Sequence, residues 1–222
     1  GHHSDRENAH LLGFLGDDRC GAGACATPHA CGDEHHIDAL QLGLDELFRL
    51  FGRGFTHRWV AAGAKAVVQG PKGKRTVPVE KFNAGPGKTT LKPGEIVVSL
   101  TLPARPKNSS DAYLRFTPRT EMDIAVVGAG VNLTLDDKGV CSAARVALGA
   151  VNVTPILVPA AAAALIGTAV DEAAIARMGA ACSAAAKPIT DKRGTQEYRI
   201  KVSGVMARRA AVIARDRAKG AK

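Results

Sequence analysis

Short apolar runs separated by turn residues occupy the middle of the chain and limit the folds it can adopt. The runs are rich in Val, Ile and Leu, and they end at clusters such as Gly70-Pro71-Lys72-Gly73 and Asp136-Asp137-Lys138-Gly139. This punctuation is typical of antiparallel strands joined by hairpins, and three or four such strands are the simplest arrangement. The strand candidates are AKAVVQG, TVPVEKF, EIVVSLTLP, AYLRFTP, IAVVGAGVNLTLD and GVCSAARVALGAV.

Beyond Pro155 the pattern becomes helical. The segments VPAAAAALIG and DEAAIARMGAACSAAA are rich in alanine, and Asp171 and Glu172 stand where acidic residues favour a helix amino terminus. A long basic stretch from Tyr198 to Lys222 is expected to continue the helical part. Strands followed by helices predict an α+β fold, with a small antiparallel sheet packed against a helical bundle.

Composition changes sharply near residue 60. Residues 1–59 hold five arginines, no lysine, six aspartates and three glutamates, a net charge of −4 in a chain of net charge +9. All seven histidines precede Trp59. We therefore expect an atypical segment over residues 1–59, with residues 1–35 poorly ordered and one amphipathic helix built on apolar positions from Ile37 to Phe51.

Bulk properties exclude several classes of function. The basic charge fits nucleic acid, but 4% aromatic residues leave few platforms for stacking bases. The longest apolar run, Val158 to Ile166, is too short for a membrane helix, and the first residues lack the pattern of a secretory signal. An odd number of cysteines, five, suggests reduced thiols. We expect a cytoplasmic protein with neither nucleic acid partner nor membrane span.

Two glycine-rich motifs match phosphate-binding consensus sequences only in part. AGPGKTT has Phe82 where the phosphate-loop consensus needs glycine, and Pro93 and Gly94 oppose the helix that must follow. VVGAGVNL has Gly128 and Gly130, but Leu133 stands at the third glycine position of a dinucleotide motif. We interpret its glycines as small residues of a buried strand.

A metal site is not predicted. Cysteines and histidines gather between Cys20 and His36, but the spacing of Cys20, Cys25 and Cys31 matches neither zinc ribbons nor iron–sulfur motifs. The body of the chain has no histidine for general acid–base chemistry, so no catalytic residue is assigned. A domain without such groups is better suited to hold a cofactor or to support assembly. A metal-binding amino-terminal domain fused to a scaffold is a weaker alternative.

From Ala61 onward the chain resembles the FAD-binding medium subunit of the molybdenum hydroxylases, the xanthine dehydrogenase and aerobic carbon monoxide dehydrogenase family. The matching stretches follow one another in the order and spacing of the family over about 155 residues. They are GKRTVPVEKFNAGPGKTTLKPGEIVVSLTLP, YLRFTPRTEMDIAVVGAGVNLTL, GVCSAARVALGAVNVTP and KPITDKRGTQEYRIKVSGVMARRA.

The resemblance implies an oxidoreductase subunit that works inside a larger complex. In such a complex FAD takes electrons from the iron–sulfur small subunit, which the molybdenum-cofactor large subunit feeds, and passes them to NAD, a quinone or oxygen. The implied domains are a remnant of the FAD-binding domain over residues 60–100 and the carboxy-terminal flavoprotein domain over residues 101–222.

The resemblance also implies four cofactor-binding residues. Val97 matches a position whose backbone meets FAD, and Arg115 matches a basic residue beside the cofactor. Asp123 and Ile124 belong to a loop that lies over the flavin ring. The AGGxSL-type loop, the TIGGN-type loop and the SPAAD run, which hold the FAD diphosphate in the family, do not occur in the sequence. We therefore expect this chain alone to bind FAD weakly or not at all, and a truncated assembly module without flavin is the alternative.

Overall fold

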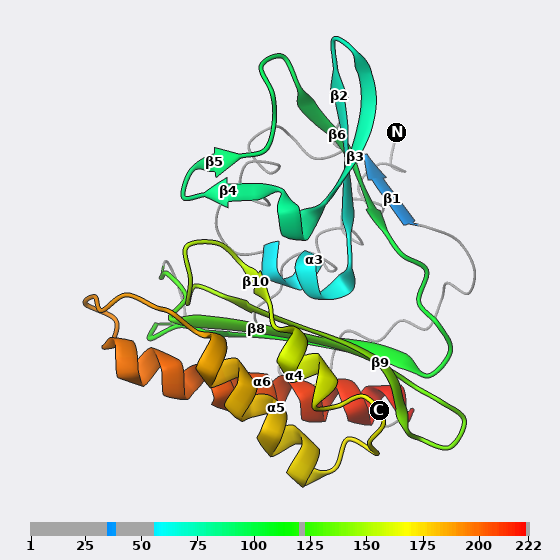
Figure 1. Cartoon of the computed structure of the whole chain (residues 1–222), viewed down its shortest axis with the longest axis vertical. Helices are drawn as coiled ribbons and strands as arrows, with labels where there is room; N and C mark the ends of the chain where they lie inside the picture. Colours follow the sequence, from blue (N-terminus) through cyan, green and yellow to red (C-terminus); the bar gives the residue numbers. More distant parts are fainter. Residues whose placement is uncertain (1–34, 39–55, 120–122, 221–222) are drawn as a thin grey trace, which may run out of the picture. The chain divides into compact units, whose positions relative to one another are not determined.

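The computed structural model describes residues 35–38, 56–119 and 123–220, which all lie in one compact unit of the chain. The mixed helix and sheet composition confirms the expected α+β class (Figure 1). The elements are β1 (His35–Asp38), α3 (Thr56–Ala62), β2 (Lys65–Gly70), β3 (Gly73–Pro78), the 3-10 helix η1 (Val79–Lys81), β4 (Asn83–Gly85), β5 (Lys88–Thr89), β6 (Ile96–Leu102), β7 (Ser109–Phe116), β8 (Val127–Leu135), β9 (Cys141–Gly149), β10 (Ile156–Leu157), α4 (Pro159–Ala163), α5 (Glu172–Ala185) and α6 (Gln196–Ala218).

The described strands form two four-stranded antiparallel sheets and one two-stranded ribbon. The first sheet has the order β1-β6-β2-β3, the second has the order β10-β9-β8-β7, and the ribbon pairs β4 with β5. This is more than the three or four strands expected from the sequence. Strands β4, β5 and β10 have two or three residues each, which is too short for an alternating pattern to reveal them.

The two predicted hairpin turns are confirmed. Strands β2 and β3 pair from Gly70 and Gly73 outward, so two residues connect them. Between β8 and β9, the Asp136 carboxylate accepts hydrogen bonds from the backbone N–H groups of Lys138 and Val140, both at 2.8 Å. A short aspartate side chain that binds its own turn in this way favours the reversal of the chain.

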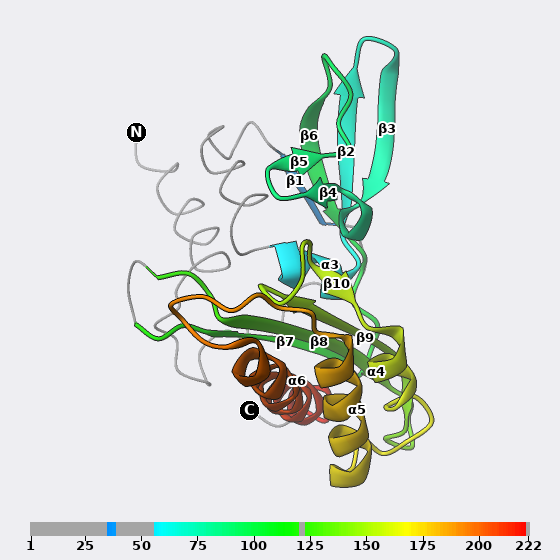
Figure 2. The same ribbon diagram turned by 60° about the vertical axis from the view of Figure 1, so that its left-hand side comes forward.

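Strand β8 is buried on both faces. Helix α6 packs against β7 and β8 on one face, and helix α3 packs against β8 and β9 on the other (Figure 2). The side chains of Ala129, Val131 and Leu133 belong to the helix-covered core and have no solvent exposure. The prediction that VVGAGVNL is a buried strand is therefore correct.

Glycines let helix α3 approach the second sheet closely. A Cβ placed on Gly149 would lie 0.9 Å from a ring carbon of His57, and a Cβ on Gly130 would lie 2.9 Å from the Cβ of Ala61. Any larger residue would therefore overlap α3. Arg145 of β9 adds a polar connection, because its Nη2 donates to the carbonyl of Val60 at 3.0 Å.

Helix α5 lies beside α6, which itself packs against the second sheet (Figures 1 and 2). Asp171 caps α5 by accepting a hydrogen bond from the Ala174 N–H, which confirms its expected place at a helix start. Thr195 caps α6 in the same way. The helices approach each other at glycine, since a Cβ on Gly204 would lie 2.7 Å from the carbonyl oxygen of Gly179.

The predicted helix built on Ile37 to Phe51 is corrected at its start. Residues His35–Asp38 form strand β1, which pairs with the outer edge of β6. Pairing with an existing strand overrides the helical spacing of apolar residues, which is only a local preference. The poor order expected of residues 1–35 can be compared only at His35, which lies in β1; residues 1–34, with Cys20, Cys25 and Cys31, and the rest of that helix lie outside the described residues.

The sequence predicted neither a membrane span nor a metal site, and the described residues bear on both expectations. No helix among them is long and apolar enough to cross a membrane. They also contain no group of three or more His, Cys, Asp or Glu side chains that could hold a metal ion.

Replacing Gly204 with alanine should destabilise the protein. The added methyl group meets backbone of α5, so the helices must separate, at a cost of about 1–3 kcal/mol for overpacking. A gain in helix propensity of about 1 kcal/mol offsets only part of this. Urea unfolding of Gly204→Ala measures the loss, with Gly85→Ala as the control because no atom lies within 4 Å of the Cβ it would add. Equal stability of both variants would contradict the close helix contact.

Cys141 and Cys182 should react slowly with thiol reagents in the native protein. Both thiols are buried, and burial raises the pKa of Cys141 and raises the pKa of Cys182 to about 12. Thiolate, the reactive form, is therefore scarce at neutral pH. Mass-spectrometric labelling in buffer and in denaturant should show both sites modified rapidly only after unfolding.

Candidate functional site

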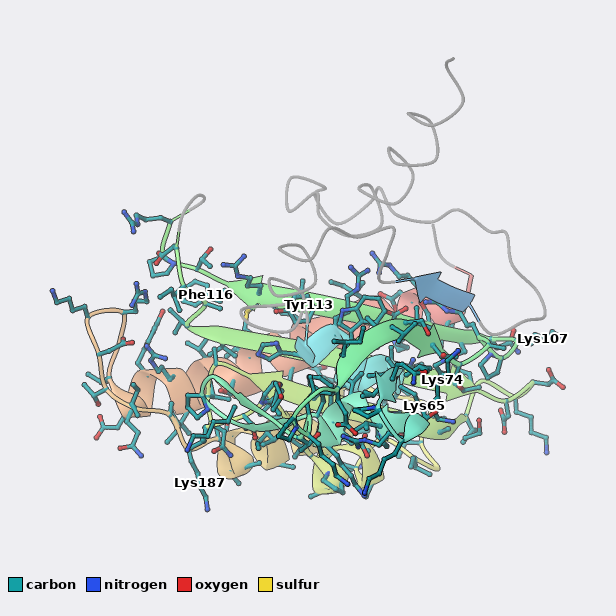
Figure 3. All side chains as sticks on the ribbon, turned by 90° about the horizontal axis from the view of Figure 1, so that it is seen from above. Lys65, Lys74, Lys107, Tyr113, Phe116 and Lys187 are labelled. Carbon is teal, nitrogen blue, oxygen red and sulfur yellow. The ribbon has the colours of Figure 1, made fainter. Side chains whose placement is uncertain are left out.

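Three of the four predicted site residues come together at one end of strand β7. Arg115 lies near that end, and its Nη2 donates a 2.7 Å hydrogen bond to the backbone carbonyl of Asp123. Ile124 follows directly, and 60% of its surface is exposed. Figure 3 shows this end of β7 at Phe116, opposite the end near Lys107.

Val97, the fourth predicted residue, lies in the other sheet. It belongs to β6 and pairs with Val68 of β2. The turn that leads into β6 is held by Glu95, which accepts hydrogen bonds from Arg75 Nε at 2.8 Å, from Arg75 Nη2 at 2.6 Å and from the Lys92 N–H at 2.7 Å. The structure thus places Val97 in the first sheet, Arg115 in the second sheet, and Asp123 and Ile124 in the loop between β7 and β8.

The Asp123 carboxylate organises the loop that follows β7. Its side chain is only 4% exposed, and its Oδ1 accepts hydrogen bonds from Arg193 Nε at 3.0 Å and from the Ile124 N–H at 2.8 Å. Its Oδ2 accepts a hydrogen bond from the Arg119 N–H at 3.2 Å. The bond from Arg193 is the main cause that lowers the pKa of Asp123 below its ordinary value. Asp123 is therefore ionised at neutral pH and surrounded by donors.

A second carboxylate extends this network toward helix α6. The Oδ1 of Asp191 accepts hydrogen bonds from the Arg193 N–H at 2.8 Å and from the Arg199 guanidinium. These two interactions, in that order, lower the pKa of Asp191. The Arg199 side chain is 4% exposed and lies in the first turns of α6, where its Nη1 also donates to the carbonyl of Ala150 at 3.4 Å.

Asp191, Arg193 and Arg199 were not predicted as site residues. The stretch KPITDKRGTQEYRI stood out only as part of the family resemblance. The sequence did contain one local signal. An aspartate just before a helix, here Asp191, can bind an arginine at the start of that helix, here Arg199. Arg193 and Asp123 are 70 positions apart in the sequence, so no local pattern predicts the hydrogen bond between them.

Exposed apolar side chains accompany this charge network. Ile124, Val153 and Ile189 expose 60%, 69% and 72% of their surfaces. The loops that carry Val153 and Ile189 are tied together by a 2.8 Å hydrogen bond from the Lys187 N–H to the Val151 carbonyl. The loops after β7, after β9 and before α6 lie at the same end of the second sheet (Figures 1 and 2). The result is an apolar surface beside several arginines.

Comparisons with known proteins match most of the described chain. Residues 54–105 match the FAD-binding domain family in molybdopterin dehydrogenases, and residues 112–213 match the CO dehydrogenase flavoprotein C-terminal domain family. The chain is 36% identical over 157 residues to the carbon monoxide dehydrogenase medium chain of Afipia carboxidovorans, which covers 71% of this chain and 54% of that protein.

This chain belongs to the FAD-binding medium subunit family of the molybdenum hydroxylases. A putative xanthine dehydrogenase FAD-binding subunit of Escherichia coli K12 is 37% identical over 94 residues, which are 42% of this chain and 32% of that subunit. The structure superposes on a reconstituted CO dehydrogenase chain from Oligotropha carboxidovorans with a TM-score of 0.70 at 33% identity, covering 74% and 57% of the two chains. The chain thus spans about half the length of the medium chains it matches.

The family match begins at residue 54, before the Ala61 at which the resemblance in the sequence starts. Helix α3, which the sequence analysis did not predict, therefore lies within the family region. The two matches meet between residues 105 and 112, in the connection between the first and second sheets.

The described residues fit the ring side of a flavin better than its diphosphate side. Arg115, Arg193 and exposed Ile124 offer positive charge and an apolar surface, which suit a flat polar heterocycle. Diphosphates are usually bound by free N–H groups at a helix amino terminus. In the described part of the chain, helices α5 and α6 instead have amino termini capped by Asp171 and Thr195.

Stability should depend on pH through Glu95. Arg75 is the main cause that lowers the pKa of Glu95 to about 2 in the folded protein, whereas an unfolded glutamate has a pKa near ~4.3. The pKa of Glu95 is lower in the folded than in the unfolded protein, so ionised Glu95 stabilises the fold. This stabilisation is complete above pH ~4.3 and is lost as the pH falls toward about 2.

Thermal unfolding of wild type and Glu95→Gln between pH 2 and 7 measures this effect. The difference in Tm should be largest above pH ~5 and should shrink steadily in acid. Asp137→Asn is the control, because the Asp137 side chain is 88% exposed and its nearest ion pair, with Lys107, is 3.7 Å long. A Tm difference for Glu95→Gln that does not change with pH would rule out the ionised pair as its cause.

Proposed function

We propose that this chain acts in an FAD-binding electron-transfer subunit of a molybdenum-containing hydroxylase or dehydrogenase complex. The observation that carries the proposal is the joining of Arg115, Asp123 and exposed Ile124 at one end of the second sheet, in a chain of this family. The proposed partners are a molybdenum-cofactor large subunit and an iron–sulfur small subunit. The proposed acceptor is NAD, a quinone or oxygen, and the proposed location is the cytoplasm.

The residues of the site have separate proposed roles. Ile124 would contact a face of the flavin ring, and Arg115 would place positive charge beside it. Val97 would contribute backbone from strand β6. Asp123 would orient rather than react, since arginine and backbone donors occupy both of its oxygens. FAD, when bound, would supply the redox chemistry by accepting electrons and passing them on.

The proposed domains follow the expectation from the sequence. Residues 60–100 would be a remnant of the FAD-binding domain, and residues 101–222 would form the carboxy-terminal domain of the flavoprotein subunit. Residues 1–59 would be an atypical segment. The separate membership of β2, β3 and β6 in one sheet and of β7 to β10 in another supports a boundary in the connection between β6 and β7.

A second candidate is an assembly module that holds the complex together without flavin. The observation that favours it is the self-capping of helices α5 and α6 by Asp171 and Thr195, which leaves those amino termini unsuited to phosphate. Flavin absorbance in the purified protein separates the two candidates, because only the first predicts a flavin spectrum.

The isolated chain should bind FAD weakly or not at all. A diphosphate normally accepts several charge-assisted hydrogen bonds, each worth about 1.5–3 kcal/mol, so the loss of each weakens binding roughly 10-fold to 150-fold. Titration of FAD into the purified protein, followed by flavin fluorescence, gives the affinity. Saturable binding below ~1 μM would contradict the prediction and would show that residues 1–59 supply a phosphate site.

A further inference from the structure

A continuous chain of charged groups connects helix α6 to the loop after β7. Arg199 of α6 binds Asp191, the backbone of Arg193 also binds Asp191, and the Arg193 side chain reaches Asp123 at 3.0 Å. Arg115 then donates to the Asp123 carbonyl at 2.7 Å. Together these links connect helix α6, the segment before it, the loop after β7 and strand β7.

Arg193 occupies the central position in this chain. It is the residue through which the segment before α6 contacts the Asp123 carboxylate, and its side chain is 29% exposed while that of Asp123 is 4% exposed. The other groups that face Asp123 are Arg119 on its own loop and Arg115 on strand β7. Arg119 is less well placed, because its Nε lies 3.6 Å from Oδ2 and its side chain is 70% exposed.

Asp123 in turn determines the position of Ile124. The carboxylate Oδ1 that binds Arg193 also accepts the Ile124 N–H at 2.8 Å. If the Arg193 side chain is removed, the Asp123 carboxylate loses its best donor and keeps only two backbone N–H groups and the more distant Arg119 side chain, so it reorganises or takes up a proton more readily. Either response alters the acceptor that holds the Ile124 backbone.

We propose that Arg193 is a positioning residue for flavin binding, which through Asp123 holds Ile124 and Arg115 in the arrangement that receives the flavin ring. This inference rests on the proposed function and adds to it a residue that contacts the ring only through others. Asp191 and Arg199 support this role, because they fix the backbone of Arg193 and tie its segment to the start of α6.

The test compares Arg193→Gln and Arg193→Lys with the control Arg209→Gln in the full chain. Arg209 is an exposed arginine of α6 without a salt bridge to any described residue. The first measurement is an NMR titration of the Asp123 carboxyl carbon, which reports the interaction without any ligand. The second is the affinity for riboflavin and for FAD, since riboflavin has the ring but no phosphate. Tm values confirm that the variants are folded.

The expected result is a higher titration midpoint for Asp123 and a riboflavin affinity reduced about tenfold or more in Arg193→Gln, because one charge-assisted hydrogen bond is lost. Arg193→Lys should recover part of both effects, and Arg209→Gln should match wild type in both. An unchanged Asp123 midpoint in Arg193→Gln overturns the inference. A shifted midpoint with unchanged flavin affinity also overturns it, because Asp123 would then be held without consequence for the ring.

Failure of the proposed function would look different. If wild type binds neither riboflavin nor FAD, the assembly module without flavin is favoured, and the positioning role for flavin fails whatever Asp123 does. If wild type binds riboflavin and all variants bind it equally, the proposed function survives and only the role of Arg193 is refuted.

Discussion

Burial of strand β8 on both faces is the constraint on which the rest of the structure depends. The face of β8 that packs on α6 carries Ala129, Val131 and Leu133. The face of β8 that lies against α3 carries glycine. Tyr113 of β7 packs over Gly128 on the α3 side. Because side chains alternate along a strand, Arg115 lies on the same face as Tyr113, at the end that leads to Asp123. Core packing therefore determines where the site arginine extends.

Arginine partners account for the carboxylates that organise the described loops. Glu95, Asp123 and Asp191 are each bound by an arginine and by backbone N–H groups, and each has a lowered pKa. Such pairs contribute geometry more than net stability, since desolvation offsets much of the attraction. In a chain with net charge +9, these few acids fix the places where loops meet.

Local patterns in the sequence predicted the elements whose causes are local. The β2–β3 and β8–β9 hairpins follow from their turn residues, and Asp171 marked the start of α5. The helix expected from Ile37 failed at its first residues because strand pairing with β6, a distant segment, decided their conformation. Helix α3 was missed because its seven residues are held by contact with β8 and β9 more than by periodicity.

The sequence by itself determined the α+β class and the succession of strands and then helices after residue 60, and through resemblance it indicated the family and the candidate residues Val97, Arg115, Asp123 and Ile124. Only the tertiary structure decided that Val97 lies in a different sheet from Arg115 and that Arg193, Asp191 and Arg199 complete the network around Asp123. The physical reason is the range of the interactions. Turns and caps depend on neighbours a few residues away, whereas a hydrogen bond between Arg193 and Asp123 depends on how the whole sheet and its helices pack.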